Sequence, residues 1–180
     1  MLEYLIKDST YYVCKLLFKT SAERKNFWRK YDKEMYHYYI KKAKNKRFFS
    51  DEIIWEKKSP DSVSQYKNNV YLIQSWQTAS AASSVVNFIK AYKTGITIGT
   101  EISDGIASYA NILYFKMKHS KLDFTCSTSY CEHAKAENEP VKGRILPDVA
   151  YPISNPFKSF TIEELKEMLR LAEEHKIQVK

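Results

Sequence analysis

The residues best placed to do chemistry are a serine and its small neighbours in the segment Thr78-Ala79-Ser80-Ala81-Ala82. Ser80 follows an apolar run that predicts a buried strand and precedes an amphipathic pattern that predicts a helix. A serine at such a junction presents its Oγ beside the free N–H groups and positive dipole end of the helix, which can stabilise an oxyanion. Ser80 is therefore a candidate nucleophile, and the small Thr78 and Ala79 leave room for a peptide backbone to approach. The alternative, from spacing alone, is that Ser80 simply caps the helix.

The elements that position Ser80 form a strand–helix–strand unit. Residues 70–73 are a short apolar run, residues 81 to about 95 carry an apolar face at helical spacing, and residues 96–99 hold a second apolar run. A unit of this length is typical of a parallel crossover, because two parallel strands need a long connection between them. We therefore expect Ser80 at the edge of a parallel sheet.

A β-hairpin and a final helix are predicted downstream. Residues 111–117 and 122–130 predict two antiparallel strands, because apolar and polar residues alternate along the second of them. The segment Thr161-Ile162-Glu163-Glu164 is a capping box, which predicts the start of a C-terminal helix.

The first third of the chain is predicted to be helical. Apolar residues at helical spacing indicate one helix over residues 2–20 and a second that begins after Ser21 as its N-cap, whereas residues 48–58 break the helical period. We expect one α/β domain, in which residues 1–67 are a basic, Tyr-rich helical segment and residues 68–180 are the α/β core with the C-terminal helix.

Several motifs, in this order, resemble those of the C-terminal-processing (tail-specific) serine peptidases. Residues 78–82 resemble the nucleophile motif, Ile98-Gly99-Thr100 resembles the strand end that follows it, and residues 143–149 resemble a late G-x-G-I-x-P-D-[IV] segment. The resemblance covers residues 70–156 well. It implies a partial crotonase/ClpP-like core, hydrolysis of peptide bonds through an acyl-enzyme, and export to the cell envelope or beyond.

Carried over by position, the resemblance makes Ser80 the nucleophile and the backbone N–H of Ala81 one oxyanion donor. The family's Gly-Gly oxyanion loop has no counterpart, the position of its lysine base holds Gly105, and that of its acidic residue holds Ser83. A serine without a base is as unreactive as an ordinary alcohol near neutral pH. We therefore expect half of a site, inactive alone, with His133 as a distant candidate for the base.

The glycine content agrees with half a site. The chain has four glycines in 180 residues, whereas an ordinary domain has roughly 7%, and it lacks the Gly-rich motifs of nucleotide-binding modules. We interpret the shortage as a sign that the Gly-Gly loop belongs to sequence not present here.

The cysteines indicate neither a disulfide framework nor a metal site. Cys14, Cys126 and Cys131 are an odd number. Cys126, Cys131 and His133 have a spacing that zinc could use, but no convincing fourth ligand accompanies them. We therefore expect no metal and no cofactor.

The positive charge is concentrated at the start of the chain. Of a formal net charge of +8, residues 1–67 contribute 16 Lys and Arg against nine Asp and Glu. Basic residues among tyrosines suggest nucleic acid, but a solvated, lysine-coated helical face with tyrosines packed inward is the favoured interpretation. The sequence shows no signal peptide and no apolar run long enough to span a membrane.

Three hypotheses for function remain. The first is the C-terminal part of a serine peptidase that acts on peptide or protein substrates and is completed by a missing N-terminal half or a second copy of the chain. The second is a non-catalytic relative that binds peptides by strand addition at a sheet edge. The third, a basic nucleic-acid-binding protein, is not favoured.

Overall fold

The computed structural model describes residues 5, 10–56, 66, 68–105, 107–134 and 143–178. The chain divides into two compact units that alternate along the sequence. The first unit comprises residues 1–13, 54–106 and 133–180, and the second comprises residues 14–53 and 107–132. Each unit thus takes residues from both sides of position 67, where the predicted N-terminal segment ends.

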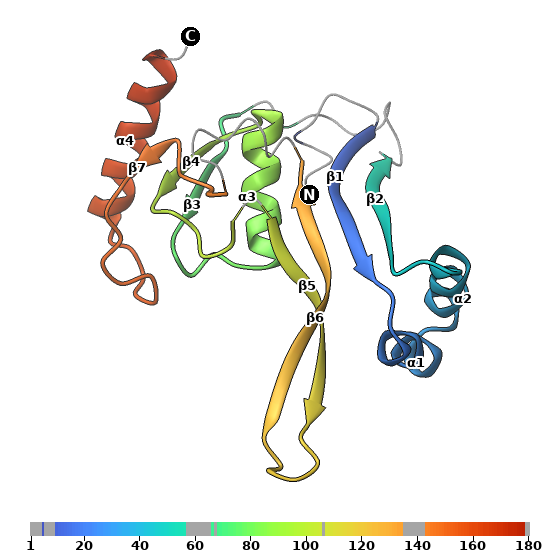
Figure 1. The fold of residues 1–180 in the computed structure, drawn as a ribbon. Helices are drawn as coiled ribbons and strands as arrows, with labels where there is room; N and C mark the ends of the chain where they lie inside the picture. The colour runs from blue at the N-terminus through green and yellow to red at the C-terminus, as the bar shows by residue number, and fades with distance from the viewer. Residues whose placement is uncertain are drawn as a thin grey trace. The chain divides into compact units, whose positions relative to one another are not determined.

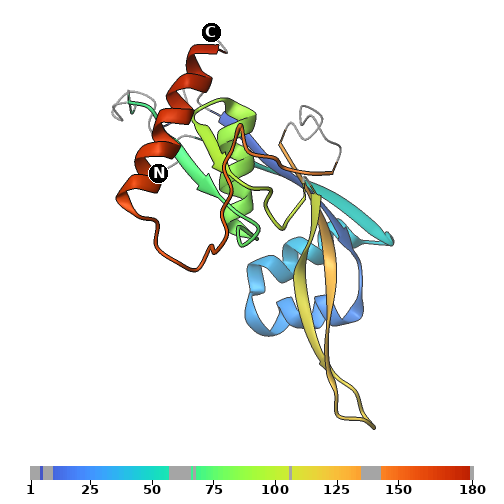
Figure 2. The same ribbon diagram turned by 90° about the vertical axis from the view of Figure 1, so that its left-hand side faces the viewer.

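The first unit holds the strand–helix–strand element that the sequence predicts. Strand β3 (Tyr71–Gln74), helix α3 (Ala81–Tyr92) and strand β4 (Ile96–Gly99) follow one another, and β4 pairs in parallel with both β3 and the short β7 (Val149–Ala150). This sheet lies between α3 and α4 (Ile162–Gln178) (Figures 1 and 2). The predicted parallel crossover is confirmed.

The two faces of this sheet bury different side chains because successive strand residues point to opposite faces. Leu72 packs on the α3 side, against the buried Val86. Ile73 packs on the other side, against Met168 and Ala172 of α4. Thr161 begins α4 with the predicted capping box, in which its N–H donates to a Glu164 carboxylate oxygen at 2.7 Å and its Oγ1 accepts from the Glu164 N–H at 3.2 Å.

Hydrogen bonds to Asp148 and a glycine at its end fix β4 in place. Asp148 accepts hydrogen bonds from the Thr97 N–H and hydroxyl, each at 2.8 Å, and from Lys90 Nζ at 2.7 Å. Gly99 ends β4 with φ +129°, and a Cβ there would lie 2.0 Å from the Gln74 carbonyl oxygen. The position therefore requires glycine, because both its backbone angle and the space around it exclude a side chain.

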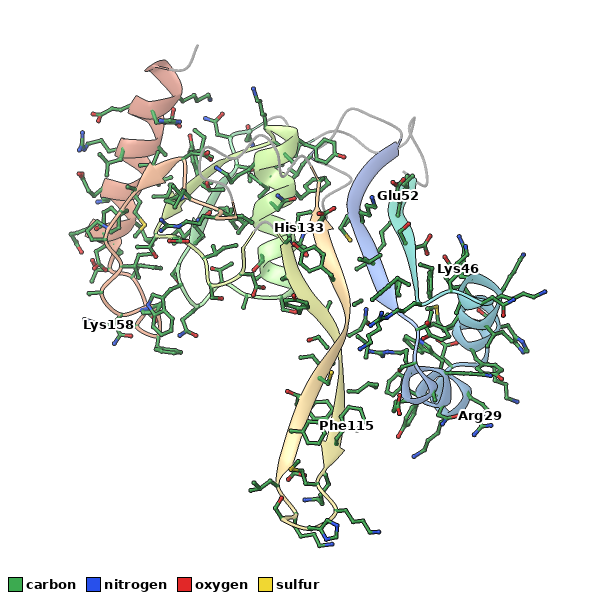
Figure 3. All side chains as sticks on the ribbon, in the orientation of Figure 1. Arg29, Lys46, Glu52, Phe115, His133 and Lys158 are labelled. Carbon is green, nitrogen blue, oxygen red and sulfur yellow. The ribbon has the colours of Figure 1, made fainter. Side chains whose placement is uncertain are left out.

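The second unit is built on strands that pair in the order β2-β1-β6-β5 within the described residues. Strands β1 (Thr10–Lys19) and β2 (Phe48–Glu56) flank helices α1 (Ala22–Tyr31) and α2 (Lys33–Ala43), whereas β5 (Ala107–Lys116) and β6 (Asp123–His133) form the predicted hairpin. The hairpin strands are longer than the predicted ones, and Figure 3 shows Phe115 near the turn, where its ring stacks on that of Phe124.

The predicted helix over residues 2–20 is wrong at residues 10–19, which form strand β1; residues 2–4 and 6–9 lie outside the described residues. The start of β1, Thr10-Tyr11-Tyr12-Val13, is rich in the β-branched and aromatic residues that strands favour. Residues 48–56, where the helical period ends, form β2. The N-terminal segment is therefore mixed, not helical throughout.

The second predicted helix begins at its predicted cap but is divided in two. Ser21 accepts a hydrogen bond from the Arg24 N–H at 3.1 Å, as an N-cap should. At Asp32 the backbone is extended, and its carboxylate caps the next helix by accepting from the Met35 N–H at 2.9 Å. The predicted inward packing of the tyrosines is confirmed only in part, because Tyr39 is buried while Tyr31 is 64% exposed.

A buried arginine joins α1 to the hairpin. The guanidinium of Arg24, 2% exposed as a residue, donates to the Thr128 hydroxyl and to the Asn111 carbonyl. Asn111 has φ +55° in the middle of β5, and its carbonyl also accepts from the Thr128 hydroxyl at 2.8 Å. Nearby, Phe18 and Phe49 stack with ring centroids 4.9 Å apart in the core of this unit.

The fold class is mixed α/β, as predicted, and the finer crotonase/ClpP-like assignment stays a prediction. None of the described helices is both long and apolar enough to cross a membrane.

Candidate active site

The backbone at Ser80 adopts a conformation that L-residues rarely take. Ser80 has φ +57° and ψ −124°, directly before the first residue of α3. Such angles cost about 1–3 kcal/mol for a residue with a Cβ and persist only where the surrounding structure holds them. A sharp, strained turn between a strand and a helix is also the geometry that exposes a nucleophilic serine in α/β hydrolases.

The capping interpretation of Ser80 is not supported. Although Ser80 occupies the N-cap position of α3, its side chain makes no capping hydrogen bond. The residue is exposed, and its Oγ has no hydrogen-bond partner within the described part of the chain. The hydroxyl is therefore available to a bound molecule.

Asp104 holds this turn from the other side. Its Oδ2 accepts hydrogen bonds from the Ser80 N–H and, at 3.0 Å, from the Ser83 hydroxyl. Ser83 is fully buried, so its hydrogen bond to Asp104 lies on the buried side of the turn. Position 83, where the resembled family commonly has an acidic residue, therefore holds a serine that is hydrogen-bonded to a carboxylate from the loop after β4.

Hydrogen bonds to Ser75 and Ser103 hold Thr78, two residues before Ser80. The Thr78 carbonyl accepts from the Ser103 N–H at 3.3 Å and from the Ser103 hydroxyl at 3.1 Å, and the Thr78 hydroxyl accepts from the Ser75 N–H at 3.1 Å. Ala79 is exposed. That Thr78 and Ala79 bind substrate stays a prediction, and for Thr78 these loop contacts already occupy the polar atoms.

Ala81, the predicted oxyanion donor, begins α3, the helix that follows Ser80. The first N–H groups of a helix have no partner within it. The Ser80 N–H donates to Asp104, so the Ala81 N–H remains the candidate oxyanion donor next to Ser80, and this role stays a prediction. The positive end of the helix dipole favours negative charge there.

His133 is not joined to Ser80. It is the last residue of β6 (Figure 3) and is buried, at 6% exposed. Burial lowers its pKa below the ordinary value of 6.5, and the charge of Asp104 opposes that shift. The imidazole is therefore neutral near pH 7, as a general base must be, but the described residues include no hydrogen bond between it and the Ser80 hydroxyl.

The described residues contain no cluster of three or more His, Cys, Asp or Glu side chains placed to hold a metal ion. Of the three residues with a zinc-like spacing, Cys126 is exposed while Cys131 and His133 are buried.

Asp104 is the site residue that sequence reasoning missed. The sequence comparison with the resembled family concerns only its neighbour Gly105, which lies at the position of the family's lysine base. The place of Asp104 in the loop directly after the second parallel strand was the available signal, because loops at the carboxyl ends of neighbouring parallel strands meet at one edge of a sheet.

The chain is distantly similar to solved structures, two of which are those of a candidate peptidase and a lipoprotein. No protein-family model matches the chain, and no curated protein matches it. The structure of a candidate peptidase from Parabacteroides merdae shares 10% identity and a TM-score of 0.48 over 99% of this chain and 45% of that one. A lipoprotein from Streptococcus agalactiae shares 14% identity and a TM-score of 0.41 over 70% of this chain and 41% of that one. The chain spans less than half the length of either.

Proposed function

We propose that this chain carries the nucleophile part of a serine peptidase of the tail-specific type, with Ser80 as the nucleophile. The observation that carries the proposal is the strained backbone of Ser80 at a strand-to-helix turn. A residue that only capped α3 would need neither a positive φ nor an exposed, unbonded hydroxyl, since a cap takes extended angles and accepts a backbone hydrogen bond.

In this proposal the Ser80 hydroxyl attacks the carbonyl carbon of a peptide bond and forms an acyl-enzyme, which water then hydrolyses. The N–H of Ala81 donates to the oxygen on which negative charge develops. Asp104 acts as a positioning residue, because it binds the Ser80 N–H and so holds the turn that aims the hydroxyl. Thr78 and Ala79 line the approach of the peptide.

The general base and the second oxyanion donor come, in this proposal, from a polypeptide segment outside the 180 residues, either another part of a longer chain or a second copy. His133 remains the candidate within the chain, and it would have to approach Ser80 on assembly. Export to the cell envelope belongs to the same proposal.

A fluorophosphonate probe tests the nucleophile directly, because it phosphonylates an activated serine and marks the residue for peptide mass spectrometry. We expect slow labelling of the chain at Ser80, with rates that rise with pH, because the oxyanion donor and the geometry accelerate attack even without a base. The Ser80→Ala variant should lose the label.

Ser84→Ala is the matched control, because Ser84 lies on the same first turn of α3 and has no place in the proposed site. It should be labelled at Ser80 as fast as the wild type. A label spread over several serines and tyrosines, or absent from Ser80 at every pH, would contradict a nucleophile at Ser80 and favour the non-catalytic, peptide-binding alternative.

A further inference from the structure

Two cysteines that lie 117 positions apart in the sequence meet inside the second unit. Cys14 lies on β1 and Cys131 on β6, and these strands are neighbours in the sheet. Both residues are buried, at 5% and 8% exposed, and their thiols are hydrogen-bonded to each other. The side chains therefore share one face of the sheet.

We propose that Cys14 and Cys131 are a redox pair that a disulfide-containing thiol oxidant converts into a disulfide between β1 and β6. Neighbouring strands lie about 4.7–4.9 Å apart, and disulfides join residues whose Cα atoms are about 4.4–6.8 Å apart. Two buried cysteines on the same face of neighbouring strands therefore need little backbone movement to bond.

The pKa values of the two thiols shift in opposite directions, which suits thiol–disulfide exchange. The hydrogen bond from Cys131 lowers the pKa of Cys14, while burial opposes that change. The same hydrogen bond and burial raise the pKa of Cys131. In the proposal, Cys14 is therefore the attacking thiolate and Cys131 the resolving thiol.

The reaction balances as two exchanges. The Cys14 thiolate attacks one sulfur of the oxidant RS–SR, which forms a Cys14–SR mixed disulfide and releases RS⁻. Cys131 then loses its proton and attacks the Cys14 sulfur, which expels the second RS⁻. Two protein thiols are oxidised, and the oxidant is reduced to two RSH molecules that carry the two protons.

This pairing changes the sequence-based view of the cysteines, which found no disulfide framework in an odd count. The third residue, Cys126, also lies on β6 but is exposed. It is therefore the thiol left over, and a chain with a Cys14–Cys131 bond would suit an oxidising compartment, where disulfides persist.

The test uses the full chain with Cys126→Ser, incubated for hours with oxidised and reduced glutathione, then acid-quenched, alkylated and mapped by mass spectrometry. We expect most of the protein to carry a linked Cys14–Cys131 peptide that is lighter by two hydrogens and holds no glutathione. A parallel sample is refolded from urea in the same buffer. There the oxidant can reach the two cysteines before they are buried.

The matched control is Cys131→Ser, which keeps Cys14 and the exposed Cys126. It should give no internal link and should collect glutathione at Cys126. The proposal would be overturned if Cys14 and Cys131 were both alkylated in the native and the refolded Cys126→Ser samples. It would also be overturned if each carried glutathione and no link formed. Neither result depends on the chemistry of Ser80.

Discussion

Replacing Ser80 by glycine should stabilise the fold, which is the opposite of what loss of a helix cap would do. Holding a residue with a Cβ in such a strained conformation costs about 1–3 kcal/mol, and glycine removes this cost at Ser80, where φ is +57°. The added conformational freedom of glycine in the unfolded chain reduces this gain in stability by about 0.5–1 kcal/mol. The hydrogen bond from the residue 80 N–H to Asp104 is a backbone bond and is kept.

We therefore expect the free energy of unfolding to rise by about 1 kcal/mol in Ser80→Gly, a shift of about 0.5 M in the urea midpoint if m is near 2 kcal/mol/M. Ser80→Ala keeps the strain and loses no capping bond, so its stability should stay within about 0.5 kcal/mol of the wild type. A capping serine would instead lose about 1 kcal/mol on conversion to alanine.

Urea unfolding followed by circular dichroism measures these differences, and Ser84→Gly is the control for glycine in the helical first turn. It should lower stability by about 0.5 kcal/mol, since glycine is a poorer helix former than serine. A Ser80→Gly midpoint that falls together with that of Ser84→Gly would refute the argument that the turn is strained.

Three further changes have expected outcomes. Gly99→Ala should lower the thermal midpoint strongly, because its Cβ would lie 2.0 Å from the Gln74 carbonyl oxygen. Gly143→Ala should cost only the backbone strain of its φ of +82°, because nothing lies within 4 Å there. Arg24→Ala should lower the unfolding free energy by about 2–3 kcal/mol in urea titrations, because it leaves a buried hydroxyl and carbonyl without their charged donor; an unchanged midpoint would contradict this role. Stability should fall as the pH drops below 6.5, because the unfolded chain protonates His133 before the folded chain, whose pKa is lowered, does. His133→Gln should flatten that part of the pH–stability curve. An unchanged slope would contradict the prediction and assign the pH dependence to other titratable groups.

Local patterns predicted the elements around Ser80 because those elements are decided by local chemistry. The apolar runs before and after α3 are short and are flanked by polar or small residues, and the capping box at Thr161 is satisfied by its own two side chains. The strand at residues 10–19 was missed because its apolar residues also recur at helical spacing. Pairing with a strand more than a hundred residues away decides between the two structures.

The site was predicted in part for the same reason. The place of Ser80 before a helix follows from its neighbours, but its backbone angles depend on Asp104, which reaches it from the loop after β4. Nothing in the spacing of Cys14 and Cys131 indicates their contact either, since a sheet brings them together across 117 positions. Contacts between distant segments are the part of this structure that local sequence patterns do not specify.

The most direct test of the central claim is an equilibrium one that needs no general base. A peptide boronic acid accepts the oxygen of a nucleophilic serine and becomes tetrahedral, like the intermediate that an oxyanion donor stabilises. Boron NMR of the chain with such a peptide should show tetrahedral boron, with a shifted amide resonance for Ala81, and both signals should vanish in Ser80→Ala. Boron that stays trigonal with the wild type, or a tetrahedral signal that survives in Ser80→Ala, would contradict a nucleophile at Ser80.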